Sequence, residues 1–267
     1  MAFKDARKGR GLYLAEVVRR TQVSPHVVRV TVAGDSLASL PRHGFDHWFR
    51  LFLPRDDGAV DFSHVPEQLG LGSYLKFLTS PAGTRPVFRS YTVRELRSET
   101  GELDIDFVVH GDRGIAGPWA SRAEPGDRVA ILDQGRGFDL LPDADFHLLA
   151  GDESALPAIA GILRDLPRDA RGLALIEVPE IDDIQPVDNP DGVEVRWLPR
   201  GDADDVPGVK ALEALHTFTP EHPATLSAYV VGEQALATGG RRHLVAMGVP
   251  KSRIEFVGYW RIGKAAA

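Results

Sequence analysis

Four consecutive residues, Arg89-Ser90-Tyr91-Thr92, combine a cation, an aromatic ring and two hydroxyls in one short segment. On a strand, Arg89 and Tyr91 share one face, and Ser90 and Thr92 share the other. A flavin site needs a ring to stack on the isoalloxazine, a hydroxyl or amide near its N5 atom and a cation for its pyrophosphate. The tetrapeptide supplies all three, although an ordinary strand with an exposed arginine would look the same.

A second segment, DFVVHGDRGIAGPWA at 106–120, reads as a strand, a glycine-bearing turn and the start of a helix near Ile115. Asp106 and Val108 lie on one face of that strand, and His110 would continue the face. Backbone N–H groups at a helix start attract anions, and a cofactor pyrophosphate is the expected anion here. His110 could hydrogen-bond a cofactor carbonyl or phosphate, or it could be a simple turn histidine.

A third segment, AGDESALPAI at 150–159, lies between a strand and a helix, where α/β sheets bind ligands. It lacks the GxGxxG fingerprint, and Asp152 or Ser154 would serve equally well as a helix N-cap. A fourth cluster, Tyr259-Trp260-Arg261, could form a flap over a flavin ring or simply cover a barrel.

The elements that would position these clusters change rhythm along the chain. Short alternating strands joined by Gly/Pro turns fill the first half and predict an antiparallel barrel; they are expected at 28–32, 48–53, 89–94, 103–109 and 128–132. Strands and amphipathic helices alternate in the second half and predict a parallel sheet in an α/β domain. The boundary is expected near Pro142.

Bulk composition excludes several classes of protein. The formal charge of −7 argues against general nucleic-acid binding, and the absence of cysteine excludes disulfides and thiolate-held metal centres. No run of about 18 apolar residues predicts a membrane span, and the basic N-terminal residues lack the apolar stretch of a signal peptide. We therefore expect a cytoplasmic protein.

A metal pair at His43 and His47 is not expected. The two histidines are four residues apart, but Pro41 and Gly44 argue against the helix that would align them.

Seven clusters follow one another in an order that resembles the siderophore-interacting protein family, a branch of the ferredoxin–NADP reductase-like flavoproteins. In chain order they are RSYTVR, DFVVHG, GIAGPWA, PGD, GDESALPAI, YVVGE and GYWRIG. The resemblance runs from about residue 12 to the end. It implies an antiparallel six-stranded FAD-binding β-barrel at 1–142, followed by a parallel-sheet NAD(P)H-binding α/β domain at 143–267.

The resemblance also implies which residues hold the cofactors. We expect FAD and NADPH or NADH to be bound by Arg89, Ser90, Tyr91, Thr92, Asp106, Val108, His110, Gly114, Ala116, Gly117, Trp119, Asp152, Glu153, Ser154, Tyr259 and Trp260. The sequence departs from the family pattern in two places. Ile115 and Gly117 replace a proline and a serine in the phosphate segment. Phe49 stands where the family has a siderophore-binding lysine, with Arg50 one place later, on the other face unless a bulge intervenes.

The implied activity is NAD(P)H-dependent reduction of a ferric siderophore to release Fe(II), with Arg50, Arg136 and Arg261 as the candidate substrate contacts. A general flavin reductase with another acceptor and a non-catalytic siderophore-binding flavoprotein are the alternatives. A ferredoxin is an alternative electron donor. We expect a monomer that neither binds nucleic acid nor enters a membrane.

Overall fold

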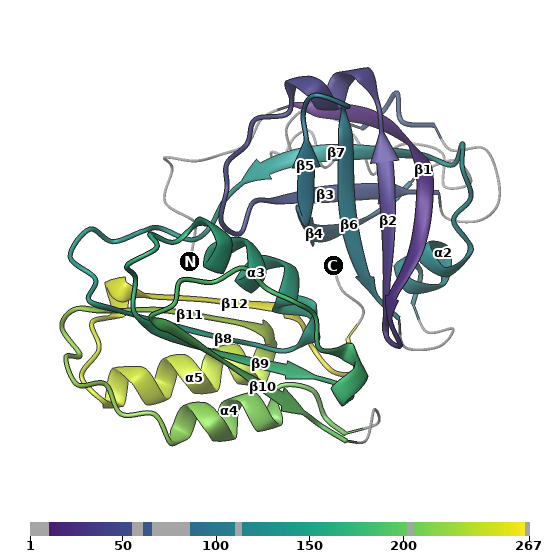
Figure 1. Ribbon diagram of the computed structural model, residues 1–267. Coiled ribbons are helices and arrows are strands. Elements are labelled where there is room, and N and C mark those ends of the chain that lie inside the picture. Colours follow the sequence, from purple (N-terminus) through teal and green to yellow (C-terminus); the bar gives the residue numbers. More distant parts are fainter. Residues whose placement is uncertain (1–10, 55–60, 66–85, 110–113, 202–204, 265–267) are drawn as a thin grey trace. The chain divides into compact units, whose positions relative to one another are not determined.

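The computed structural model describes residues 11–54, 61–65, 86–109, 114–201 and 205–264 (Figure 1). Contacts divide the chain into two compact units. The first extends to Arg136, and the second comprises Gly137 onward together with Ser24–His26 and Gly44–Asp46. The division into functional domains at 142/143 stays a prediction.

The first unit is built on a seven-stranded antiparallel sheet in the order β4-β3-β7-β1-β2-β6-β5. This confirms the predicted barrel-type architecture, with seven strands where six were expected. The strands are β1 (Leu12–Ser24), β2 (Val27–Ala33), β3 (Trp48–Leu53), β4 (Val87–Thr92), β5 (Glu95–Arg97), β6 (Glu102–Val108) and β7 (Arg128–Gly135). Two short helices, η2 (Asp35–Ser39) and α2 (Ala116–Arg122), accompany them.

Strand β1 was not predicted. Its inward residues Tyr13, Ala15 and Val17 are buried, but Leu14 and Val18 on the other face are 46% and 42% exposed. Apolar residues therefore occupy both faces, and the alternation that marks a half-buried strand is hidden.

Alternate residues of β2 and β6 form the core of the first unit. Val28, Val30 and Val32 pack with Leu103, Ile105 and Phe107, all at most 3% exposed. Burial of each such side chain contributes about 1.5–3 kcal/mol. The opposite face of β6 carries Asp104 and Asp106, so the predicted alternation is confirmed.

The second unit is a five-stranded parallel sheet in the order β10-β9-β8-β11-β12. Its strands are β8 (Phe146–Gly151), β9 (Gly172–Val178), β10 (Val193–Pro199), β11 (Leu226–Glu233) and β12 (Ile254–Trp260). Its helices are η3 (Glu153–Ala155), α3 (Leu156–Asp165), η4 (Ile181–Asp183), α4 (Val209–His216), α5 (Gln234–Ala246) and η5 (Lys251–Arg253).

Helices cover both faces of this sheet (Figure 1). Leu149 points into the cluster that contains Ile159 of α3, whereas its neighbour Leu148 points into the cluster that contains Leu215 of α4 and Leu244 of α5. The chain leaves β8 toward β9 on one side and returns as β11 on the other. A topological switch point therefore lies between β8 and β11, where open α/β sheets bind ligands.

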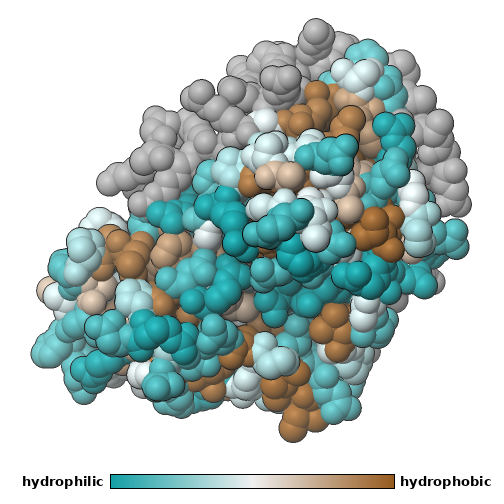
Figure 2. Space-filling model, turned by 45° about the horizontal axis from the view of Figure 1, so that its top comes forward, coloured by the Kyte–Doolittle hydropathy of each residue, from teal (hydrophilic) through white to brown (hydrophobic). Residues whose placement is uncertain are grey.

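On the face drawn in Figure 2, hydrophilic residues prevail and apolar ones gather in small groups. Among the described residues, no helix has both the length and the hydropathy needed to cross a membrane.

Candidate functional site

The first candidate site centres on β4. Arg89 and Tyr91 lie on one face of the strand, opposite Leu51 and Phe49 of β3. The Tyr91 ring is half-buried and packs against Phe107, with ring centroids 4.5 Å apart. Ser90 on the other face is exposed. The aromatic ring is thus anchored to the core without being enclosed by it.

These groups fit a flavin. Burial raises the pKa of the Tyr91 phenol, which keeps the ring neutral and suited to stacking. Arg89 Nη1 donates to the carbonyl of Phe88, and no other hydrogen bond of Arg89 is found within the described part of the chain. Its remaining N–H groups therefore suit an anion such as a diphosphate.

Asp106 has other partners in the structure. Its carboxylate accepts from Arg29 Nε at 2.6 Å and Nη2 at 2.8 Å, and Arg94 Nε lies 3.3 Å away. A β2–β6 ion pair therefore engages both carboxylate oxygens and holds Asp106 against the sheet, and contact between Asp106 and a cofactor stays a prediction. His110 lies outside the described residues.

The segment after His110 divides between core and surface. Trp119 packs on Phe107 at 5.6 Å between ring centroids and, like Ala116, is buried in the core. Gly114 is exposed with φ at 83°, and a side chain there would meet no atom within 4 Å. Gly117 is half-buried, and a Cβ at this position would lie 3.4 Å from the Val108 carbonyl oxygen. Trp119 and Ala116 support this segment from inside.

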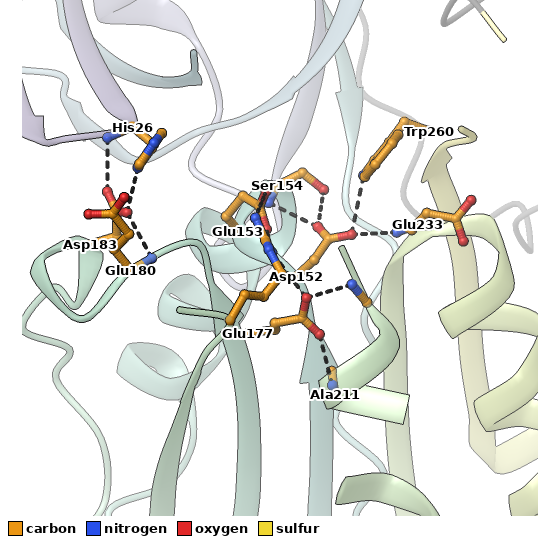
Figure 3. Close-up of polar contacts among 12 residues, drawn as sticks. His26, Asp152, Glu153, Ser154, Glu177, Glu180, Asp183, Ala211, Glu233 and Trp260 are labelled. Carbon is orange, nitrogen blue, oxygen red and sulfur yellow. Dashed lines mark hydrogen bonds and ion pairs between the residues drawn. The ribbon is translucent and has the colours of Figure 1, made fainter. Parts of the chain in front are cut away.

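The second candidate site lies at the carboxyl edge of the parallel sheet. Asp152 directly follows β8, and its carboxylate accepts from the backbone N–H and hydroxyl of Ser154 at 3.0 and 2.5 Å (Figure 3). It also accepts from Glu233 N at 2.6 Å and from Trp260 Nε1 at 3.2 Å. Residues from β8, β11 and β12 therefore converge at the switch point.

Asp152 is fully buried. Burial and, secondly, the charge of Glu153 raise its pKa to about 7. Near neutral pH the carboxyl thus carries only part of its negative charge, which lowers the negative charge of this edge.

Glu153 lies beside Asp152 and is held by an internal ion pair. Arg200 donates to Glu153 at 2.7 and 2.9 Å and to Glu177 at 3.0 Å, and all three residues are at most 4% exposed. Glu177 also accepts from the backbone N–H groups of Gly208 and Ala211. This network fixes the start of η3 to β9 and α4, so Glu153 supports the site from within the sheet.

Close packing at the same edge requires glycine. A Cβ at Gly232, where φ is 119°, would lie 2.6 Å from Asp152 Oδ2. A Cβ at Gly151 would lie 2.4 Å from Ala155 Cβ. The strand–helix turn at 151–155 can therefore reach the β11 backbone only because both positions lack side chains.

The C-terminal aromatic residues are tied to this edge. Tyr259 and Tyr229 hydroxyls are 2.8 Å apart, and Tyr229 donates to Asp46 at 3.0 Å. The Trp260 indole donates to Asp152, and the backbone N–H of Ile262 donates to Glu233 at 3.3 Å. The predicted flap therefore has fixed attachments within the second unit.

Of the three candidate substrate arginines, Arg50 and Arg136 belong to the first unit and Arg261 belongs to the second. Continuous β3–β4 register pairs Arg50 with Ser90, and its guanidinium lies over the Phe88 ring at 5.2 Å. Arg50 is therefore on the face opposite Tyr91, while Phe49 is fully buried. Arg136 is half-buried in the first unit, and Arg261 is exposed in the second.

Sequence reasoning missed several partners in these clusters. Four of these residues have hydrogen-bond partners 23 to 183 residues away in the sequence, namely Arg200, Glu177, Tyr229 and Asp46. Glu233 gave the clearest signal, because it ends the YVVGE segment and so marks the carboxyl end of a strand. The other four are charged or aromatic residues whose partners depend on tertiary structure.

Comparison with known proteins gives matches along nearly the whole chain. Residues 16–137 match the family model of the siderophore-interacting FAD-binding domain, and residues 144–263 match that of the siderophore-interacting protein. Ferric vibriobactin reductase ViuB of Vibrio cholerae is 32% identical, over 94% of this chain and 90% of its own. The NADPH-dependent ferric-chelate reductase of Escherichia coli is 29% identical, over 91% of each chain.

A solved structure agrees with these matches. The crystal structure of a siderophore utilization protein from T. fusca superposes with a TM-score of 0.79 and 32% identity, over 98% of this chain and 97% of the other.

Proposed function

This chain belongs to the siderophore-interacting protein family, and from that premise we propose that it is an FAD-dependent reductase of ferric siderophores driven by NAD(P)H. The observation that carries the proposal is the likeness to a ferric vibriobactin reductase across both units, since it includes the flavin and the nucleotide half alike. The balanced reaction is NAD(P)H plus two Fe(III) chelates giving NAD(P)⁺, one proton and two Fe(II).

In the first unit, Tyr91 would provide the stacking surface and Arg89 the countercharge for the diphosphate of FAD. Ser90, on the exposed face of β4, and buried Thr92 complete the predicted motif. When bound, FAD would supply the redox chemistry that links a two-electron donor, the nicotinamide, to a one-electron acceptor, Fe(III). The contribution of the chain is to orient this group and to leave one side open to a chelate.

In the second unit, the coenzyme would bind at the switch point between β8 and β11. Asp152, Ser154, Glu233 and Trp260 form a hydrogen-bonded edge there. Because Arg200 neutralises Glu153 and the pKa of Asp152 is raised, this edge is less anionic than its three carboxylates suggest. Electrostatics therefore permit a dinucleotide to approach.

The substrate side requires cations, because many siderophores and their ferric complexes are anionic. Arg136 and Arg261 are the proposed contacts, with Arg50 as a third cation on the other face of β3–β4. They would attract the chelate without ligating iron. The proposed dependence on NAD(P)H and the absence of cysteine fit a cytoplasmic location.

An anaerobic assay tests the proposal. The full chain loaded with FAD is mixed with NADH or NADPH and with catecholate, hydroxamate or carboxylate ferric siderophores, while a chromophoric Fe(II) trap records product. We expect chelate-dependent coenzyme oxidation and Fe(II) formation. Arg136→Gln should raise the KM for the chelate and leave flavin reduction by the coenzyme unchanged, whereas Arg168→Gln on the exposed surface serves as its matched control.

A general flavin reductase is the second candidate, favoured by buried Phe49 at the position of the family lysine. The same assay decides between the two. Quinones or nitro compounds reduced faster than every ferric siderophore would favour this candidate and overturn the first.

A further inference from the structure

Two histidines and one aspartate converge in the first unit. His43 Nε2 lies 3.0 Å from Asp133 Oδ2, and His47 Nε2 lies 2.9 Å from Asp133 Oδ1. The three ligand-type atoms all lie within 4.8 Å of one another. The side chains of Asp133 and His47 are 0% and 4% exposed, whereas that of His43 is 23% exposed. The cluster is thus enclosed on two sides and accessible through His43.

Backbone geometry, rather than a helix, aligns the two histidines. Gly44 and Phe45, which separate them with Asp46, have φ of 69° and 51°. Phe45 is the one non-glycine residue with positive φ in the described part of the chain. This left-handed turn places the two imidazole rings edge to face, 4.7 Å apart. Left-handed conformation at a bulky residue costs of order 1–3 kcal/mol and is concentrated at functional positions.

A β-bulge aims the aspartate at the same point. Phe49 pairs with Asp133, but Trp48 pairs with Gly135, so β7 carries one extra residue there. Bulges re-aim side chains next to sites. Two independent irregularities, one in the turn before β3 and one in β7, thus create the cluster.

The carboxylate is preorganised. Its two oxygens lie 2.9 and 3.0 Å from the imidazole Nε2 atoms, and Oδ1 also accepts from the Gly135 backbone N–H at 2.9 Å. Two imidazoles with one carboxylate are a donor set that binds Fe(II) and other divalent first-row metals, and it leaves coordination positions open.

We propose that His43, His47 and Asp133 form a binding site for a divalent first-row transition-metal ion, with Fe(II) as the occupant. On binding, each ring stays neutral: its proton passes by way of solvent from Nε2 to Nδ1, so that the Nε2 lone pair faces the metal, which replaces the two N–H···O contacts. Nitrogen and oxygen ligands, with no cysteine in the chain, favour Fe(II), Co(II) or Zn(II) over Cu(I).

The site also gives the proposed reaction a destination for its product, an extension that rests on the proposed function. Arg136, a proposed chelate contact, donates from Nη1 to the His43 carbonyl at 3.0 Å. Fe(II) that leaves a weakened chelate near Arg136 would meet the partly exposed His43 imidazole first. The cluster would then hold ferrous iron in transit.

Metal binding is measured on the full FAD-loaded chain, without coenzyme or siderophore. Co(II) serves as probe through its visible absorbance, and Fe(II) then competes under anaerobic conditions. We expect one saturable site per chain. His43→Ala should weaken binding at least about tenfold. Loss of an outer-shell partner typically costs 10–100-fold in metal affinity, and loss of a direct ligand should cost no less than the lower end of that range. His64→Ala is the matched control, because His64 forms an exposed pair with Asp61 at 3.1 Å.

A gain-of-signal variant makes the test independent of lost stability. His43→Cys introduces the single thiol of the chain, so a thiolate-to-Co(II) charge-transfer band reports direct coordination at that position. Absence of saturable binding, equal affinity of His43→Ala and wild type, or absence of the band in folded His43→Cys would each overturn the site. Reductase activity without metal binding would refute only the site, and metal binding without reductase activity would refute only the proposed function.

Discussion

Replacement of Arg200 by methionine tests how the start of η3 is held at the carboxyl edge of the parallel sheet. The change removes three hydrogen-bonded contacts, at 2.7 and 2.9 Å to Glu153 and 3.0 Å to Glu177, and leaves two buried carboxylates without their cation. Glu177 keeps its two backbone donors, but Glu153 loses both contacts to Arg200. Loss of one partner from a buried ion pair costs about 3–5 kcal/mol.

That cost is a large part of the roughly 5–15 kcal/mol by which domains are stable. With about 2–3 kcal/mol per molar urea as the slope, the unfolding midpoint of the second unit should fall by roughly 1–2.5 M. Urea titrations followed by far-UV circular dichroism and tryptophan fluorescence measure the shift.

Two further variants make the result interpretable. Arg168→Met breaks an exposed pair with Asp188, whose side chains are 58% and 66% exposed, and should change stability by less than about 1 kcal/mol. Glu153→Gln added to Arg200→Met should restore part of the loss, since it removes one uncompensated charge. A shift for Arg200→Met as small as that for Arg168→Met would refute the buried-network account.

Three other outcomes follow from the structure. Tyr91→Ala should weaken FAD binding about tenfold through loss of stacking, whereas Tyr91→Phe should not. Fluorescence titration of the apoprotein with FAD measures this, and equal affinity of the two variants would contradict it. The pKa of Asp152 is about 7 in the folded chain and about 4 in the unfolded chain, so its contribution makes stability fall as the pH rises through that window. Asp152→Asn should flatten the slope of unfolding free energy against pH, measured by urea titrations at several pH values, and an unchanged slope would disprove this. Gly232→Ala, whose Cβ would lie 2.6 Å from Asp152 Oδ2, should cost about 1–3 kcal/mol, and an unaltered thermal midpoint would count against that packing.

The sequence predicted elements better than partners. The strand at Trp48–Leu53 and the helix N-cap offered at Asp152 agree with the structure, because their patterns are local. The local pattern around Asp106 does not reveal its ion-pair partner Arg29, which is 77 residues away in sequence. Trp119 belonged to a recognised motif but lies in the core. Periodicity reveals which face is buried, and it does not reveal what packs there.

The histidine pair shows the same limit from the other side. His43 and His47 were set aside because no helix could align them, and indeed none does. A left-handed turn aligns them, and their partner Asp133 is 86 to 90 residues away, on a strand whose bulge no local pattern predicts. Side-chain clusters of this kind depend on tertiary register.

The most direct test of the central claim is a single-turnover count of iron. The FAD-loaded chain is reduced anaerobically with one equivalent of NADPH or NADH and then mixed with excess ferric siderophore in a stopped-flow instrument. We expect the flavin to reoxidise in step with the appearance of two trapped Fe(II) per coenzyme. A flavin that stays reduced in the presence of every ferric chelate, while oxygen or a quinone reoxidises it, would contradict the account.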